Sequence, residues 1–154
     1  MRRELRHAYL GTLIALVAQF LLGMAVNLFI EIAPNHPGAN PPEYFRGVAQ
    51  NVVWAILHGP SVLLTLHAIL GLLLVIFGFG LLVPALRSHH LPTVITAIVG
   101  ALAMLAAGFN GGSFLNYHED FSSMIMASLF GIALTAYAIG LWALPLPQES
   151  QTPV

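Results

Sequence analysis

Histidine and methionine are the side chains of this sequence that could bind a metal ion or a haem. The chain contains no cysteine, which excludes disulfides, thiolate metal sites, iron–sulfur clusters and covalently attached c-type haem. A b-type haem takes His/His or His/Met axial pairs, and imidazoles also bind copper and zinc. The candidate ligands for such a cofactor, with the three histidines as the metal ligands, are His58, His67, His118, Met24, Met104 and Met126.

His67 lies in a long apolar run, where an ionisable side chain is a functional candidate by default. Gly71 and Gly78 share its helical stripe, and small residues mark the face on which membrane helices pack. We therefore expect His67 to point into a helix bundle, with Gln19 or Asn27 as a hydrogen-bond partner. The alternative role for His67 is a neutral imidazole that only contributes to packing.

His118 belongs to a polar stretch, FNGGSFLNYHED (109–120), between two apolar runs. The Gly-rich part predicts that the preceding helix ends near Gly108 or at Asn110-Gly111. Asn116 followed by Glu119 fits a capping box at the start of the next helix. That pattern explains Glu119 but not His118, which leaves the imidazole as a candidate ligand. A copper or zinc site would draw on His58, His118, Glu119 and His36.

The second and last apolar runs resemble each other when the sequence is shifted by sixty positions. The shift aligns His58 with His118 and Gly71 with Gly131. It predicts two tandem helical hairpins, with the two histidines at equal depth and both glycines at helix contacts. Chance resemblance between apolar helices is the alternative. His58 and His67 lie roughly 13 Å apart along a continuous helix and on opposite faces, so a pair that includes His67 needs its second ligand from another span.

Composition places the chain in a membrane. Of 154 residues, 58% are hydrophobic and 7% are charged, whereas soluble domains carry about 25% charged residues. Four apolar runs are long enough for a bilayer crossing of roughly 20 residues. The sequence therefore predicts one all-α domain over 1–154, a polytopic membrane four-helix bundle with spans at 9–32, 61–86, 93–109 and 121–144.

A fifth helix is predicted on the outer membrane surface over 43–57, after the proline-rich segment APNHPGANPP. Asn40 is its candidate N-cap, and His58-Gly59-Pro60 is the expected hinge into the second span. Phe45, Val48, Val52 and Ile56 form one apolar stripe opposite polar residues. A direct continuation of the second span is the alternative.

The arginines predict the orientation. Arg2, Arg3 and Arg6 precede the first span and Arg87 follows the second, whereas only Arg46 lies on the other side. The positive-inside rule then places both termini in the cytoplasm, and we expect a bacterial plasma membrane. A signal peptide is the rival interpretation of the N-terminus, but the apolar run is too long and lacks a small-residue cleavage site.

The function expected from these residues is haem b binding and electron transfer. The alternatives are copper or zinc binding by a membrane protein, and a non-catalytic assembly or accessory subunit of a larger membrane complex. The net charge of −1 gives no indication of nucleic-acid binding, so the expected partners are the lipid bilayer and a membrane redox partner or a second copy of the chain. No nucleophile–base pattern suggests an enzyme acting on its own.

Overall fold

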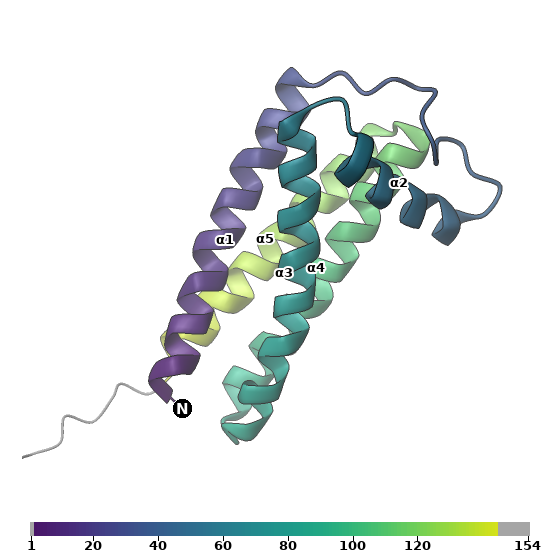
Figure 1. The fold of residues 1–154 in the computed structure, drawn as a ribbon. Coiled ribbons are helices and arrows are strands. Elements are labelled where there is room, and N and C mark those ends of the chain that lie inside the picture. The colour runs from purple at the N-terminus through teal and green to yellow at the C-terminus, as the bar shows by residue number, and fades with distance from the viewer. Residues whose placement is uncertain (1, 145–154) are drawn as a thin grey trace, which may run out of the picture.

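The computed structural model describes residues 2–144, and within that range the chain forms helices and no strands (Figure 1). The five helices are α1 (Arg2–Phe29), α2 (Tyr44–His58), α3 (Val62–Arg87), α4 (Leu91–Tyr117) and α5 (Asp120–Ala143). All but α2 are long and apolar enough to cross a membrane. The prediction of an all-helical protein with four helices that could span a membrane is therefore confirmed.

The four long helices pack side by side around a common core. Helix α1 contacts α3 and α5, and α4 also contacts α3 and α5, which closes the bundle. Helix α2 packs only on α3 and α4, across the end of the bundle that is opposite the N-terminus (Figure 1). At the N-terminal end, Arg6 Nη1 donates a hydrogen bond to the Leu144 carbonyl oxygen at 3.0 Å, joining the start of α1 to the end of α5.

Two tyrosines, Tyr9 and Tyr137, are the largest fully buried side chains. The rings of Tyr9 and Tyr137 meet edge to face with centroids 5.6 Å apart, and the Tyr9 hydroxyl donates to the Thr93 carbonyl oxygen at 2.8 Å. Glycines make room for these rings: a Cβ at Gly100 would lie 2.5 Å from the Tyr137 ring, and one at Gly140 would overlap Tyr9. Small residues thus let the helices approach around large aromatic side chains, as is usual in membrane bundles.

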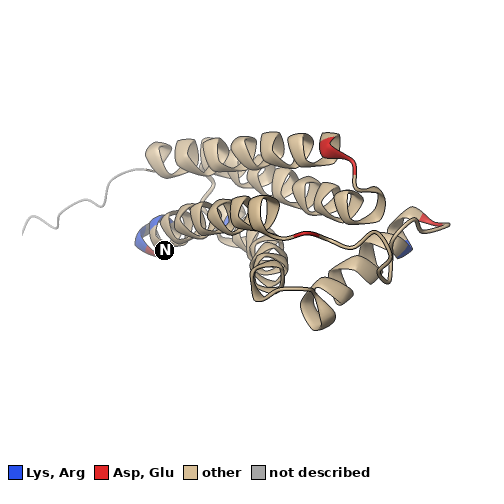
Figure 2. Ribbon diagram, turned by 90° about the horizontal axis from the view of Figure 1, so that it is seen from above, with Lys and Arg blue, Asp and Glu red and all other residues tan. Residues whose placement is uncertain are grey.

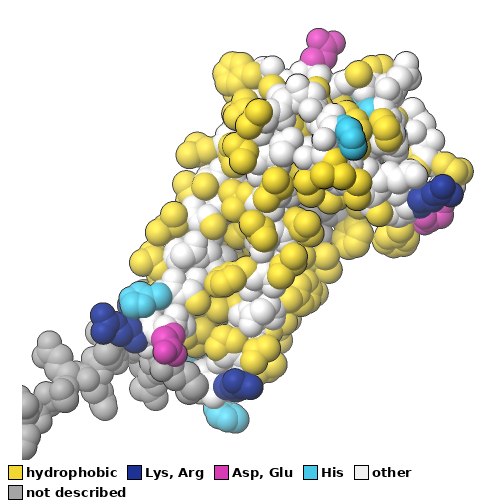
Figure 3. Space-filling view, in the orientation of Figure 1, with side chains coloured by type: hydrophobic (Ala, Val, Ile, Leu, Met, Phe, Trp, Pro, Cys, Tyr) yellow, Lys and Arg dark blue, Asp and Glu magenta, His cyan; other side chains and the backbone are white. Residues whose placement is uncertain are grey.

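The flank of the bundle is suited to lipid. Large apolar side chains point outward along α1, α3 and α5, among them Ile14, Ile76 and Trp142. Figure 3 shows apolar side chains over the visible flank and charged side chains towards the two ends. Figure 2 shows the basic start of α1 at one end, and most of the acidic positions together with one basic position towards the other. With no water in a bilayer core, helices with apolar flanks satisfy their backbone groups internally.

Helix α2 is separate from α3, as the sequence predicted. It ends at His58, and the chain turns through Gly59 before Ser61 begins α3 by accepting from the Leu64 N–H at 3.2 Å. The predicted N-cap, Asn40, is wrong. Glu43 occupies that position, and its carboxylate accepts from the backbone N–H groups of Phe45 and Arg46.

Helix α4 extends well past its predicted end. It runs through Gly108 and Asn110-Gly111 to Tyr117, so the predicted break there is wrong. The reason lies in packing: Gly112 is buried, and a Cβ there would come within 2.7 Å of Val48 in α2. Glycine here serves the close approach of α2, and bundle packing overrides its low helix propensity.

Of the two glycines predicted to lie at helix contacts, only Gly71 does so. A Cβ at Gly71 would lie 2.9 Å from Gln19 Nε2, so Gly71 does face another helix. A Cβ at Gly131 would meet nothing within 4 Å, so the predicted helix contact at Gly131 is wrong. The two positions that the sixty-residue shift aligned therefore have different surroundings.

Candidate functional site

The three predicted histidine ligands lie on different parts of the fold. His58 is the last residue of α2 and is exposed. His67 lies in α3 against α1. His118 lies between α4 and α5. Since no ring contact or hydrogen bond links any two of them in residues 2–144, their joint haem site stays a prediction.

His67 contacts α1, as its stripe of small residues predicted. The Gln19 amide nitrogen lies 3.4 Å from His67 Nε2 and donates to the His67 carbonyl oxygen at 3.1 Å. A Cβ at Gly23 would lie 2.9 Å from the imidazole Cε1. Of the two predicted partners, Gln19 is the one found, and the contact between α1 and α3 accounts for the position of the ring.

The three methionines also lie apart. Met24 is 40% exposed on α1, whereas Met104 is buried and its methyl group contacts Gly78 in the main core. Met126 is half-buried, with its sulfur against Gly111. Met104 thus fills space between helices, which is the commoner role of methionine.

A histidine pair lies under α2. The rings of His36 and His118 have centroids 5.8 Å apart. His36 also stacks on Trp54 of α2, with centroids 4.2 Å apart and planes inclined by 14°. On the other side, the His118 ring lies 6.3 Å from that of Phe114. Three elements therefore meet at this pair: the loop after α1, helix α2 and the corner between α4 and α5.

The backbone of His118 has an uncommon conformation. Its φ of 56° and ψ of 34° place it in the left-handed region, where its N–H closes α4 by donating to the Phe114 carbonyl oxygen at 2.7 Å. Glycine is the usual residue at this position of a helix end, and a side chain there costs about 1–2 kcal/mol. An imidazole held in this conformation is a reason to look for a role of that side chain.

Asn116 holds the proline-rich loop onto α4. Its carbonyl oxygen accepts from the Asn40 N–H at 2.8 Å, and its side-chain oxygen accepts from the amide of Asn51 in α2. Asn51 and Asn116 are both fully buried. The capping box predicted for Asn116 and Glu119 is therefore wrong: Asn116 lies in the last turn of α4, and the N-cap of α5 is Glu119, whose side chain makes no capping bond. A buried asparagine needs hydrogen-bond partners, and Asn51 of α2 and Asn40 of the loop supply them.

The Nε2 atoms of His36 and His118 are buried, and each lacks a hydrogen-bond partner. His36 Nδ1 lies 3.1 Å from the Pro37 carbonyl oxygen, an acceptor, so it carries the proton in that arrangement and Nε2 keeps a lone pair. With its amide turned over, Asn51 could instead donate to His36 Nδ1 at 3.2 Å. The Asn51 amide and the His36 tautomer are thus coupled, and only the first arrangement makes Nε2 a metal ligand.

The arrangement supplies two nitrogen donors rather than a larger set. Among residues 2–144, no group of three or more His, Asp or Glu side chains is placed to hold a metal ion. Glu119, a predicted additional ligand, is exposed. His58 is also exposed and lines a shallow surface groove with Trp54 and Pro37. Sequence reasoning gave His36 a minor place, since the proline-rich loop has no periodicity from which to position a side chain.

No family model matches this chain, and no curated protein or solved structure matches it either. The site geometry is therefore the basis for a functional proposal.

Proposed function

We propose that this multi-pass membrane protein binds a single copper(I) ion between His36 and His118. The observation that supports the proposal is the pair of buried, unpartnered Nε2 atoms on rings whose centroids are 5.8 Å apart. Two imidazoles bound in line to one metal ion hold their ring centres about 6 Å apart, given metal–nitrogen bonds of about 2 Å. Buried nitrogens without partners are costly, and a bound ion would remove that cost.

Copper suits a two-nitrogen site better than zinc. Structural zinc sites use four ligands and catalytic ones use three protein ligands plus water, whereas the pair provides two. Copper(I) is stable with two ligands in line, and imidazole is among the donors that suit copper. The indole of Trp54 and the ring of Phe114 flank the pair and would favour the ion of lower charge, because a dry apolar surrounding penalises charge.

Haem b is the second candidate, because its iron also takes two axial imidazoles. A macrocycle between these rings would have to part His36 from Trp54 and loosen the bond between Asn51 and Asn116. A single ion is far smaller than a macrocycle and fits the 5.8 Å separation of the ring centroids, so we place copper first. The third alternative is an assembly subunit without a cofactor, in which the pair serves packing alone.

The orientation and the finer architecture belong to the same proposal. The arginine distribution favours cytoplasmic termini, so α2 would lie at the outer surface of a bacterial plasma membrane and the copper site would face outwards. The exposed side chains of Phe45, Val53 and Leu57 support a position of α2 at the lipid boundary. The contacts of α1 with α3 and of α4 with α5 are compatible with two tandem hairpins.

The decisive experiment is a copper(I) titration of the purified full-length protein under anaerobic, reducing conditions, with a chromogenic chelator as competitor. We expect one ion per chain, and at least tenfold weaker binding in His36→Ala and His118→Gly. The glycine variant removes the imidazole and also relieves the left-handed backbone, so the corner between α4 and α5 should still form. His58→Ala and His67→Ala are the matched controls and should bind as the wild type does.

Two further readouts separate the alternatives. X-ray absorption of the copper-loaded protein should show two nitrogen ligands. When haem is added to the metal-free proteins, the Soret band of the wild type should equal that of His36→Ala. A Soret band lost in both variants would favour haem over copper. Equal copper affinity in wild type and both variants would refute the site and favour the assembly subunit.

A further inference from the structure

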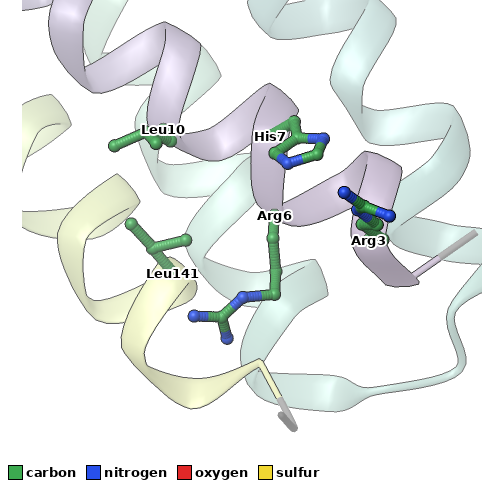
Figure 4. A pocket seen from close by; sticks show the side chains of 5 residues that line it. All are labelled: Arg3, Arg6, His7, Leu10 and Leu141. Atoms are coloured by element: carbon green, nitrogen blue, oxygen red, sulfur yellow. The ribbon is translucent and has the colours of Figure 1, made fainter. Parts of the chain in front are cut away.

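A second site lies at the opposite end of the bundle from the histidine pair. A hollow of about 390 Å³ opens between the first turns of α1 and the last turn of α5. Two arginines, one histidine and two leucines line it: Arg3, Arg6, His7, Leu10 and Leu141 (Figure 4). The hollow is thus cationic at the rim of the bundle and apolar towards the membrane.

The hydrogen bonds at this hollow leave most of its donors available. Arg6 uses one guanidinium nitrogen to bind the Leu144 carbonyl oxygen at 3.0 Å, which fixes the side chain against the end of α5. A guanidinium has five N–H donors in a planar fork suited to phosphate. Within residues 2–144, Arg3 and His7 have no hydrogen-bond or ion-pair partner. The acid of this turn, Glu4, is not among the side chains that line the hollow.

We propose that this hollow binds the headgroup of an anionic phospholipid, with Arg3 and Arg6 on the phosphate and Leu10 and Leu141 beside the first part of the acyl chains. The charge of the lining selects a negative ligand. The change from basic to apolar residues within one turn of α1 matches the boundary between headgroup and hydrocarbon. Basic pockets between membrane helices on the cytoplasmic side are suited to such lipids, and the positive-inside rule assigns this end of the bundle to the cytoplasm.

The role of the lipid would be to join α1 to α5. These are the first and last helices of the bundle, and the Arg6–Leu144 bond crosses between them at this end. A phosphate bound by Arg3 and Arg6 would add charge-assisted hydrogen bonds to that contact. The site is independent of the proposed copper site, because it shares no residue with it and lies at the other end of the helices.

The test uses the full-length protein in nanodiscs made of phosphatidylcholine alone or with one fifth phosphatidylglycerol. Native mass spectrometry after release should show at least one retained phosphatidylglycerol on the wild type, at about tenfold above its share of the lipid mixture. Arg3→Gln should weaken retention about fivefold and Arg3→Gln/Arg6→Gln about 25-fold, following the usual contribution of a basic residue near anionic lipid. Arg3→Gln leaves the Arg6–Leu144 bond intact, so its effect cannot come from a disrupted bundle.

Arg87→Gln is the control. Arg87 is the exposed last residue of α3, at the same end of the bundle as the hollow, but it does not line the hollow. It should retain the lipid as the wild type does. Equal retention by all variants, or loss in Arg87→Gln as large as in Arg3→Gln, would overturn the proposal in favour of general attraction to a charged surface. Inorganic phosphate at 10 mM is the remaining comparison, because that concentration is about ten thousand times a dissociation constant of about 1 µM and would saturate a site of that affinity. Thermal protection by phosphate that matches that of the lipid would identify a free anion as the ligand and overturn the lipid assignment.

Discussion

Replacing Asn116 by Ala should loosen α2 from α4 before the bundle itself unfolds. Asn116 is fully buried, accepts from the Asn40 backbone N–H at 2.8 Å and bonds to the side chain of Asn51, which is also fully buried. Truncation leaves the Asn51 amide buried without this partner, which costs about 1–3 kcal/mol. The backbone bond to Asn40 survives, so the loss falls on the contact between α2 and α4.

The size of this effect can be isolated with a double-mutant cycle. Asn51→Ala alone should destabilise by a similar amount, but the second substitution should cost little once its partner is gone. We expect a coupling energy between Asn51 and Asn116 of about 1–2 kcal/mol, within the range for buried contacting residues. Asn27→Ala is the control, because Asn27 is exposed on α1.

Tryptophan fluorescence provides an assay for the loosening of α2. The chain contains two tryptophans: Trp54 stacks on His36 under α2, and Trp142 is 86% exposed on α5. In a Trp142→Phe background, quenching of Trp54 by acrylamide during a thermal ramp in detergent follows this region alone. Circular dichroism at the same temperatures follows the bundle. Two results would refute the reasoning. One is that the effects of the two asparagine substitutions add; the other is that Trp54 in Asn116→Ala becomes accessible at the same temperature as in the Asn27→Ala control.

Three further predictions concern packing and topology. Gly112→Val should destabilise by about 1–3 kcal/mol through overlap with α2, whereas Gly131→Ala, with open space around it, should leave the detergent melting temperature unchanged. Tyr9→Phe should cost about 1 kcal/mol, because it removes a buried bond to a carbonyl oxygen; Tyr137→Phe should be neutral or stabilising in the same melt, because the buried Tyr137 hydroxyl has no partner. A cysteine replacing exposed His58 should react with a membrane-impermeant maleimide from outside intact cells, and labelling only after lysis would contradict the proposed orientation.

Periodicity and hydropathy were sufficient to predict the helices but not their ends. The apolar runs and Gly59-Pro60 gave the four long helices and the separate α2, since both signals are local. The end of α4 was wrong because Asn110-Gly111 is a helix terminator only when nothing packs on it. Here α2 covers that turn, and Gly112 allows Val48 to approach. Because α4 continues past the predicted break, Asn116 belongs to its last turn and is not the N-cap of α5.

The candidate site depended even more on contacts that are distant in sequence. His67 and Gln19 could be paired in advance because both lie on regular helices with readable stripes. The pairing of His36 with His118 could not, because it requires the course of an irregular loop and a left-handed residue at the end of α4. Asn116 followed by Glu119 predicted the start of the next helix, whereas the backbone N–H of His118 between them closes α4.

The length of α4 has a consequence for where the asparagine contact lies relative to the bilayer. Its 27 residues extend about 40 Å at 1.5 Å per residue, against a hydrocarbon thickness of about 30 Å. If the start of α4 lies at one face, its last two turns rise into the headgroups and carry Asn116 with them. Asn51, Asn116 and the histidine pair would then sit where water is within reach once α2 lifts. In a thicker bilayer these groups would lie closer to the hydrocarbon, and α2 would lie deeper in the headgroup region. Membrane thickness would therefore affect the position of α2 and the stability of its contact with α4.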